Sequence, residues 1–474
     1  MVNLANDWNG PNDPDNPRNF PRIIRLSSMV AVTLLAFTGS FAGAIYAPAQ
    51  EQIMQWQQCT YEVAILPLSL YNLGLAFGPI IGAPLSETYG RKAVFVVTTP
   101  LCILFLLGGG LTTTIASLSV CRFFAGVFAS PNINNASAVI LDYSAPHSRG
   151  VSLGMYYSVP SLGASIAPLV GGFIVPHRSW RWTQWVAILV TGGFYIPVLF
   201  TRETYKKVIL RRRAIALGLT DAYSSSSTPK HPLRYFFTVL IHRPIHMLLT
   251  EPIVSFVSLY NGLIYGLLYT FVTSIPWIFA TYYDFGPAAQ SLSYLGVTVG
   301  TVLACAPFAL IDIRFYQRRL QRWKSAHGEG SQLPPQNRLL SALVGSIPLP
   351  ASLFIAGWAA EYRVHWIVPI VFQGVAMLSC FLVYAGANLF MLDVYGPLYS
   401  ARGWVGDQLV GVFDAGDGAD SLVFLGLGGV VEEEESKTAD GLPKTAAVDA
   451  VFGRAAATPS ATPPCTYVHA PPSH

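Results

Sequence analysis

Residues Trp366 to Leu392 read WIVPIVFQGVAMLSCFLVYAGANLFML, a run of 27 residues without a charged side chain. A helix needs about 20 apolar residues to cross the hydrocarbon core of a bilayer, which is roughly 30 Å thick. Met29–Ala49 and Val94–Leu111 are further uncharged stretches of about that length. The chain is therefore predicted to be an all-α membrane protein.

The composition agrees with this class. Hydrophobic residues make up 52% of the 474 residues and charged residues only 11%, whereas soluble domains carry about 25% charged residues. The six cysteines are scattered, without metal-like or redox-like spacing. No nucleophile–base pair or phosphate-binding loop stands out. We therefore expect no metal, no cofactor and no enzymatic activity.

Uninterrupted apolarity, bounded by charged or Gly/Pro-rich turns, delimits ten membrane-spanning segments. They are predicted at 29–49, 63–84, 93–112, 115–140, 151–175, 183–201, 252–282, 289–311, 339–358 and 366–392. The apolar run at 29–49 has full membrane length and follows a polar, proline-rich start, so we expect it to be a retained anchor and not a cleaved signal peptide.

The basic residues predict the orientation. With a cytoplasmic N-terminus, the inside segments before residue 400 hold 21 Lys and Arg residues and the outside loops hold three. Such a bias indicates an N-in orientation by the positive-inside rule. It also explains the net charge of +4 without a nucleic-acid partner.

The chain divides into five predicted parts. Residues 1–28 form a cytoplasmic tail, 29–201 an N-terminal six-helix bundle, 202–250 a basic cytoplasmic linker, and 251–399 a C-terminal bundle with four helices present. Residues 400–474 are a divergent tail expected to be disordered. Its one candidate span, Leu409 to Val431, contains three aspartates, and each costs about 2.5–3.5 kcal/mol near the middle of a membrane helix. We do not expect it to insert.

The loop between the second and third spans carries a turn with charges on both sides. It reads APLSETYGRK from Ala83 to Lys92. A glycine permits a tight turn, an acid stands at a helix end, and two cations follow. We expect a charged gating loop with Glu87, Gly90, Arg91 and Lys92 as its functional residues.

Two later spans hold further candidates. Arg122 is a lone cation inside the fourth span, and a buried charge in a membrane is by default a functional residue; the alternative is that it snorkels to the outer interface. The fifth span is rich in residues that bend helices or let them approach closely. These are Pro160, Gly163, Pro168, Gly171 and Gly172.

These motifs together resemble those of the major facilitator superfamily, and within it the fungal drug:proton antiporters with twelve spans. The 83–92 loop resembles the family's signature loop, and the fifth span its antiporter motif. The resemblance covers about residues 8 to 400. It also rests on Trp8–Phe20 (WNGPNDPDNPRNF), Leu141-Asp142 with Arg149-Gly150, Trp180-Arg181-Trp182, Glu203-Thr204-Tyr205, and Arg243-Pro244 with Glu251-Pro252.

The resemblance implies a monomeric secondary transporter that exports small organic compounds, such as drugs, toxins or polyamines, in exchange for protons. It implies the plasma membrane, with the vacuolar membrane as the alternative. Arg122 is the one ionisable residue predicted within the spans, so it is the candidate for coupling. The implied substrate cavity would be lined by Tyr46, Asn72, Asn132, Asn134, Asn135, Tyr156, Tyr157, Tyr260, Asn261, Tyr265, Tyr269, Gln373 and Asn388.

Against a twelve-span plan, the ten predicted spans place a break between the tenth and the eleventh. We expect a frameshifted gene model or a truncated allele, in which Glu87 lacks the eleventh helix that the family's loop acid engages. The alternative function, left open, is a non-transporting pseudo-transporter or a membrane sensor.

Overall fold

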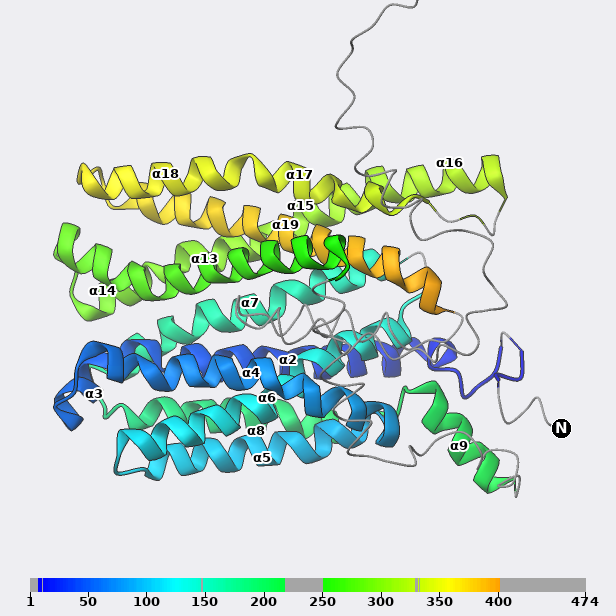
Figure 1. Ribbon diagram of the computed structural model, residues 1–474, viewed down its shortest axis with the longest axis horizontal. Helices are drawn as coiled ribbons and strands as arrows, with labels where there is room; N and C mark the ends of the chain where they lie inside the picture. The colour runs from blue at the N-terminus through cyan, green and yellow to red at the C-terminus, as the bar shows by residue number, and fades with distance from the viewer. Residues whose placement is uncertain are drawn as a thin grey trace, which may run out of the picture. The chain divides into compact units, whose positions relative to one another are not determined.

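The computed structural model describes residues 7–10, 12–145, 148–217, 250–328, 331 and 333–400. All regular secondary structure in these residues is helical (Figure 1). The long helices are α2 (Arg22–Ala44), α4 (Tyr61–Tyr89), α5 (Arg91–Leu111), α6 (Ile115–Tyr143), α7 (Arg149–Ile174), α8 (Arg181–Leu199), α13 (Pro252–Tyr283), α15 (Tyr294–Ile311), α18 (Pro348–Glu361) and α19 (Ile367–Ser400).

Shorter elements connect them. They are η1 (Pro17–Asn19), η2 (Ala47–Ala49), α3 (Gln50–Gln57), α9 (Lys206–Ala216), α14 (Pro287–Leu292), the π-helical turn η4 (Asp312–Tyr316), α16 (Gln317–His327), η5 (Pro335–Leu339) and α17 (Leu340–Ser346).

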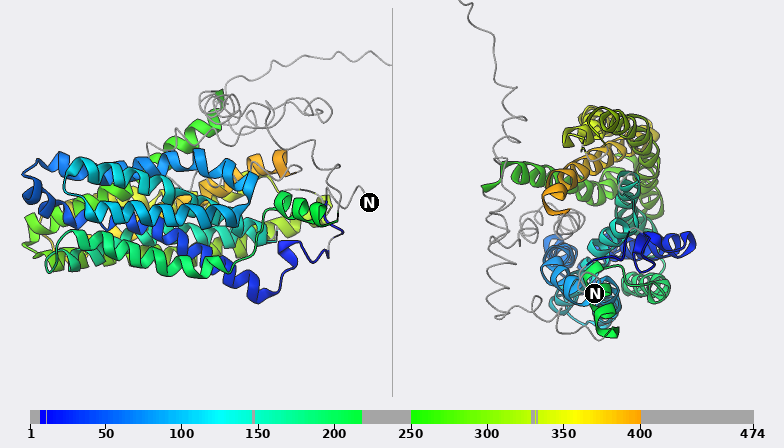
Figure 2. Two further views of the ribbon diagram at one scale, coloured as in Figure 1. Left: turned by 90° about the horizontal axis from the view of Figure 1, so that it is seen from below. Right: turned by 90° about the vertical axis from the view of Figure 1, so that its right-hand side faces the viewer.

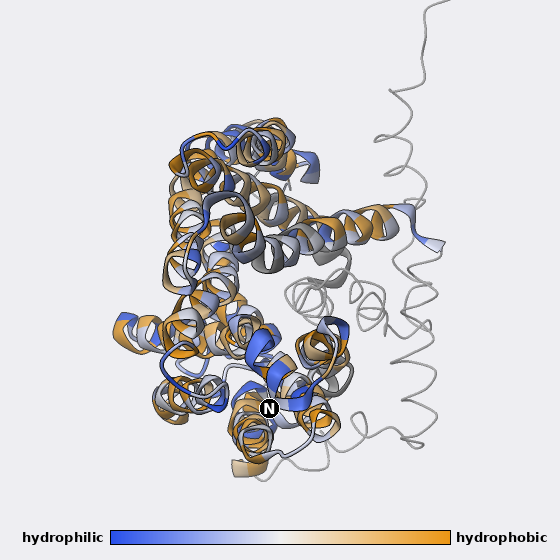
Figure 3. Cartoon of the chain, turned by 90° about the vertical axis from the view of Figure 1, so that its left-hand side faces the viewer, coloured by the Kyte–Doolittle hydropathy of each residue, from blue (hydrophilic) through white to orange (hydrophobic). Residues whose placement is uncertain are grey.

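Each of the ten predicted spans lies in helical structure, which confirms the all-α prediction for the described residues. Seven segments of this part of the chain are long and apolar enough to cross a membrane. α6 is not among them, because Arg122 and three asparagines lower its mean hydropathy. Hydrophilic residues concentrate at the helix ends (Figure 3).

Two boundaries differ from the prediction. The first helix begins at Arg22 and not at residue 29, because a helix can continue beyond the apolar stretch when its charged side chains reach water. The predicted linker at 202–250 begins with α9, whose Val208, Leu210 and Ala214 are buried. Residues 218–249 and the predicted tail from 401 lie outside the described residues.

The helices run side by side in both views of Figure 2. In the first group, α2–α8, the fourth long helix α6 packs on α4 and α5, and α2 packs on α7 and α8. In the second group, α13–α19, the last helix packs on α15, α17 and α18. The two groups meet where α7 packs on α15 and α19.

The N-terminal segment is bound to α9 by charge pairs, which we call the N-terminal clasp. Arg213 donates two hydrogen bonds to the Asp13 carboxylate, at 2.9 and 2.7 Å, and also pairs with Asp15. Lys206 pairs with Asp7 at 2.6 Å. Asp13 is only 2% exposed, so this pair is shielded from water and can order the segment before the first helix.

Candidate functional site

The turn of the predicted gating loop is built around Gly90, which joins α4 to α5. Its φ is +103°, a conformation that L side chains rarely adopt. A Cβ at this position would also lie 2.3 Å from Oε2 of Glu203. Glycine is therefore required here for both backbone conformation and space.

The carboxylate of Glu203 caps the N-terminus of α5. It accepts hydrogen bonds from the backbone N–H groups of Arg91 at 2.9 Å and Lys92 at 3.1 Å. It also accepts from the N–H groups of Thr204 and Tyr205, both at 3.0 Å. A carboxylate is stabilised at this position because the helix N-terminus carries free N–H groups and a partial positive charge.

The Arg91 side chain completes the turn. It is 4% exposed, donates from Nη1 to Ser86 Oγ at 2.8 Å, and stacks over the Tyr205 ring at 4.9 Å. Sequence reasoning quoted Glu203 within a family motif but assigned it no role. Glu87 lies half-buried near the C-terminal end of α4, and its gating role stays a prediction.

A second charged cluster lies at the same end of the helices, around Arg338 of η5. Its guanidinium pairs with Asp312 at 2.6 Å and with Asp393 at 2.7 Å, and it stacks over Tyr316 at 3.4 Å. The π-helical turn Asp312–Tyr316 brings the acid and the ring to one face, a distortion that often marks functional sites.

This cluster touches the start of α7. A Cβ at Gly150 would lie 2.4 Å from Arg338 Nη1 and 2.5 Å from Asp312 Oδ1. The backbone of the first helix group therefore directly abuts an ion pair of the second. Sequence reasoning missed the cluster; its signal was an acid at the end of each of two spans and an arginine before a third.

Arg122 of α6 points into the helix group and not to the outer interface. It is 1% exposed and donates hydrogen bonds to the carbonyls of Ala42 at 2.7 Å and Gly43 at 2.8 Å. The guanidinium also stacks on the rings of Tyr46 at 5.0 Å and Tyr71 at 4.7 Å. The snorkelling alternative is thus excluded, and the cation is compensated by carbonyls and aromatic faces.

The helix predicted to resemble the antiporter motif is α7. It runs without interruption through Pro160 and Pro168. A Cβ at Gly163 would lie 2.5 Å from the carbonyl oxygen of Phe37, and one at Gly171 would lie 2.7 Å from that of Ile45. These two glycines let α7 approach α2 closely. Gly172 faces the other group, where a Cβ would overlap Ser291 of α14.

The predicted cavity residues of the first group are mostly buried and hydrogen-bonded. Tyr46 donates to the carbonyl of Ala64 at 2.8 Å, and Tyr156 donates to that of Ile133. Asn132 accepts from Thr99 at 3.0 Å, Asn134 donates to Ser130 at 3.2 Å, and Asn135 is 3% exposed. These contacts account for several of the candidates by structure alone.

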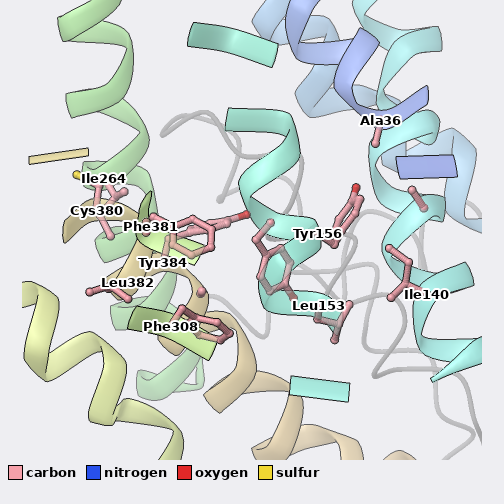
Figure 4. Packing of buried hydrophobic residues seen from close by; sticks show 14 of the residues in the cluster. Ala36, Ile140, Leu153, Tyr156, Ile264, Phe308, Cys380, Phe381, Leu382 and Tyr384 are labelled. Carbon is pink, nitrogen blue, oxygen red and sulfur yellow. The ribbon is translucent and has the colours of Figure 1, made fainter. Parts of the chain in front are cut away.

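Two contacts of the predicted residues join the helix groups. Tyr269 of α13 donates to Oδ1 of Asn72 on α4 at 3.3 Å. The Tyr157 ring of α7 meets the Tyr384 ring of α19 edge to face, with centroids 5.6 Å apart. Figure 4 shows Tyr384, Phe381 and Phe308 on one side of α7, with Ala36 and Ile140 on the other.

Tyr384 is a central residue that sequence reasoning missed, because an aromatic residue in an apolar span has no distinguishing pattern. It is 4% exposed and also packs edge to face against Tyr265, at 5.2 Å. One helical turn away, Asn261 donates to Asn388 at 3.2 Å. Of the remaining candidates, Gln373 is buried and Tyr260 is 38% exposed.

Comparisons with known proteins agree with one another. The family model of the Major Facilitator Superfamily matches residues 31–406. The chain is 32% identical over 401 residues to the MFS-type transporter hepF of Aspergillus oryzae, covering 83% of this chain and 81% of that one. It is also 32% identical over 410 residues to fluconazole resistance protein 1 of Saccharomyces cerevisiae, covering 85% and 73%.

The fold has relatives among solved structures. The xylose transporter XylE from E. coli, in a partially occluded inward-open conformation, superposes with a TM-score of 0.56 and 13% identity. The match covers 86% of this chain and 94% of that one. At this identity the likeness shows the fold alone.

Proposed function

Because the chain belongs to the major facilitator superfamily, and is thus a multi-pass membrane protein of a secondary-transporter family, we propose that it exports small organic compounds in exchange for protons. Its similarity to a fluconazole resistance protein supports drug-like compounds and toxins as substrates, with polyamines as a further class. Such relatives are transporters, which supports a non-enzymatic role.

The observation that carries the proposal is the kind of contact that joins the two helix groups. At one end, the Gly150 backbone abuts the Arg338–Asp312 pair; farther along α7, one ring contact links Tyr157 to Tyr384. Ion pairs and ring edges can break and re-form without unfolding either group. Alternating access requires such contacts, since rigid bundles rock about a fixed site.

The other elements of the proposal follow the same plan. Residues 29–201 and 251–399 act as the two rocking halves, with the N-terminus in the cytoplasm as the positive-inside bias supports. The loop at Glu87–Lys92 gates the cytoplasmic end. Arg122 modulates proton exchange from its buried position between Tyr46 and Tyr71. We place the monomeric protein in the plasma membrane, with the vacuolar membrane as the alternative.

Expression in a yeast strain lacking its own efflux pumps tests this function. We expect lower accumulation of a fluorescent azole in cells with the protein, and loss of that difference when a protonophore collapses the pH gradient. Arg122→Gln is the matched variant, which should insert normally but not export. Unchanged accumulation despite confirmed membrane insertion would refute export and favour a sensor.

A further inference from the structure

Two neighbouring pairs of side chains join α13 to α19. The first is the ring pair of Tyr265 and Tyr384, with centroids 5.2 Å apart and planes at 85°. The second is the amide pair, in which Asn261 Nδ2 donates to Asn388 Oδ1 at 3.2 Å. The members are four residues apart on each helix, so one helical turn separates the ring pair from the amide pair.

The amide pair has hydrogen-bonding capacity that this part of the structure does not use. Asn261 and Asn388 are 2% and 1% exposed. Among the described residues, Asn261 Oδ1 and Asn388 Nδ2 have no hydrogen-bond partner, and neither does Ser258 Oγ, one turn earlier on α13. A buried polar group without a partner is costly, so these groups are better suited to a ligand than to packing.

The unused groups select a chemical class. The amide pair offers one acceptor and one donor side by side, and exchanging the oxygen and nitrogen assignments of both amides leaves the same complement. A carboxamide or lactam satisfies both groups at once. An ammonium group can only donate and a carboxylate can only accept, so each would leave one group of the pair unsatisfied.

The ring pair has a face that the other helix group covers. The Tyr157 ring of α7 meets Tyr384 at 5.6 Å and 76°, while Tyr265 lies on α13, in the same group as Tyr384. If α7 moves away from α19, Tyr384 keeps the contact with Tyr265 and loses the one with Tyr157. A planar ring can then take the place of the Tyr157 ring.

We propose that Tyr384, Tyr265, Asn261, Asn388 and Ser258 form a substrate subsite for a neutral planar ring that carries a carboxamide or lactam. Tyr157 occupies the ring position of this subsite when the two helix groups are closed. The inference rests on the proposed transport function and narrows its substrates: it favours ring amides and disfavours polyamines.

Binding to the purified full chain in nanodiscs tests the subsite. The probes are radiolabelled quinolin-2-one, which is a planar lactam, naphthalene, which has the rings without the amide, and spermidine. We expect wild type to bind quinolin-2-one most tightly. Asn388→Leu should raise its Kd about tenfold, as for a lost hydrogen-bonded contact, and should leave the Kd of naphthalene unchanged.

The tyrosine variants separate ligand contact from a structural role. Tyr384→Leu should weaken binding of both ring compounds, while Tyr384→Phe should retain it. Tyr157→Leu should tighten quinolin-2-one binding, because it removes the competing ring, a gain that structural damage does not produce. Trp277→Leu, at an aromatic that is 60% exposed on α13, is the control and should change none of the affinities.

The proposal is overturned if spermidine binds more tightly than quinolin-2-one, if Asn388→Leu leaves the Kd of quinolin-2-one unchanged, or if Tyr157→Leu weakens binding as much as Tyr384→Leu does. Failure of the transport function looks different. In that case the affinity pattern holds, but vesicles containing wild type do not accumulate quinolin-2-one when a pH gradient is imposed.

Discussion

Replacing Glu203 with glutamine should destabilise the first helix group, because this carboxylate has a contact that glutamine cannot reproduce. Oε1 accepts from the N–H groups of Arg91, Thr204 and Tyr205, and Oε2 accepts from that of Lys92. In Glu203→Gln one oxygen becomes an NH₂ group, which can only donate. The best orientation keeps three of these bonds and turns a donor towards the Lys92 N–H.

The magnitude follows from the lost contact and the lost charge. A hydrogen bond to a charged group contributes about 1.5–3 kcal/mol, and a charge at an exposed helix terminus about 0.3–1 kcal/mol. Glu203 is 8% exposed, so solvent does not screen the effect. We expect a loss of about 2 kcal/mol or more, which corresponds to roughly 4–8 °C in the unfolding midpoint of a unit of 150–250 residues.

The assay is the temperature at which the purified full chain in detergent loses its monodisperse elution peak. Glu62→Gln is the matched control, since it makes the same chemical change at an exposed acid in the first turn of α4. Glu203→Gln should lower the midpoint and Glu62→Gln should not. Equal midpoints for the two variants would refute the capping role of Glu203.

Three further perturbations follow from the contacts described above. Arg122→Lys should reduce pH-driven uptake into vesicles at least tenfold, because one ammonium cannot both bridge two carbonyls and stack between two rings as the guanidinium does. Gly150→Ala should push α7 from the Arg338–Asp312 pair and speed labelling of an introduced cysteine, Tyr157→Cys, by a thiol reagent from the cytoplasmic side. Arg213→Glu should release the N-terminal clasp, measured as faster tryptic cleavage at Arg18.

Matched variants control the last two of these. Gly266→Ala makes the same change where a Cβ meets nothing within 4 Å, so it should leave labelling unchanged. Arg212→Glu reverses a charge next to Arg213 on an exposed position of α9 and should leave cleavage unchanged. Equal effects of either variant and its control would contradict the contact in question.

The clasp also has a predictable pH dependence. Hydrogen bonds from Arg213 hold the pKa of the Asp13 carboxyl below its usual value of 3.8. A lowered folded-state pKa means that the pair contributes its full stability above pH 3.8 and loses it only as the pH falls through the lowered value. Cleavage at Arg18 should therefore be constant between about pH 5 and 8, and a rise in cleavage from pH 8 to pH 5 would contradict the assignment.

The sequence could predict where helices lie, because each span is a long apolar run with a charged or Gly/Pro-rich boundary. It could also predict that Arg122 is buried for a purpose, since a lone cation in an apolar span has few alternatives. Its partners could not be predicted, because the carbonyls of Ala42 and Gly43 belong to backbone, which every sequence provides.

Partners from distant parts of the chain were also beyond the sequence. Glu203 is separated from Arg91 by 112 positions, and no local pattern distinguishes it from other acids at the ends of spans. Tyr384 stands in a span where aromatic packing is common, and only its neighbours on α7 and α13 reveal its position.

The contacts differ in kind along α7, and this difference has a consequence for how the groups can move. At the helix start, the Gly150 backbone meets a charged pair that is 5–8% exposed; water entering there can solvate the separated charges and lower the cost of opening. Eight residues of α7 separate this contact from the ring pair of Tyr157 and Tyr384, where separated rings gain nothing from water. A planar ligand with its own ring removes that cost. Opening at the charged end should therefore be driven by solvation, and opening at the ring pair by substrate.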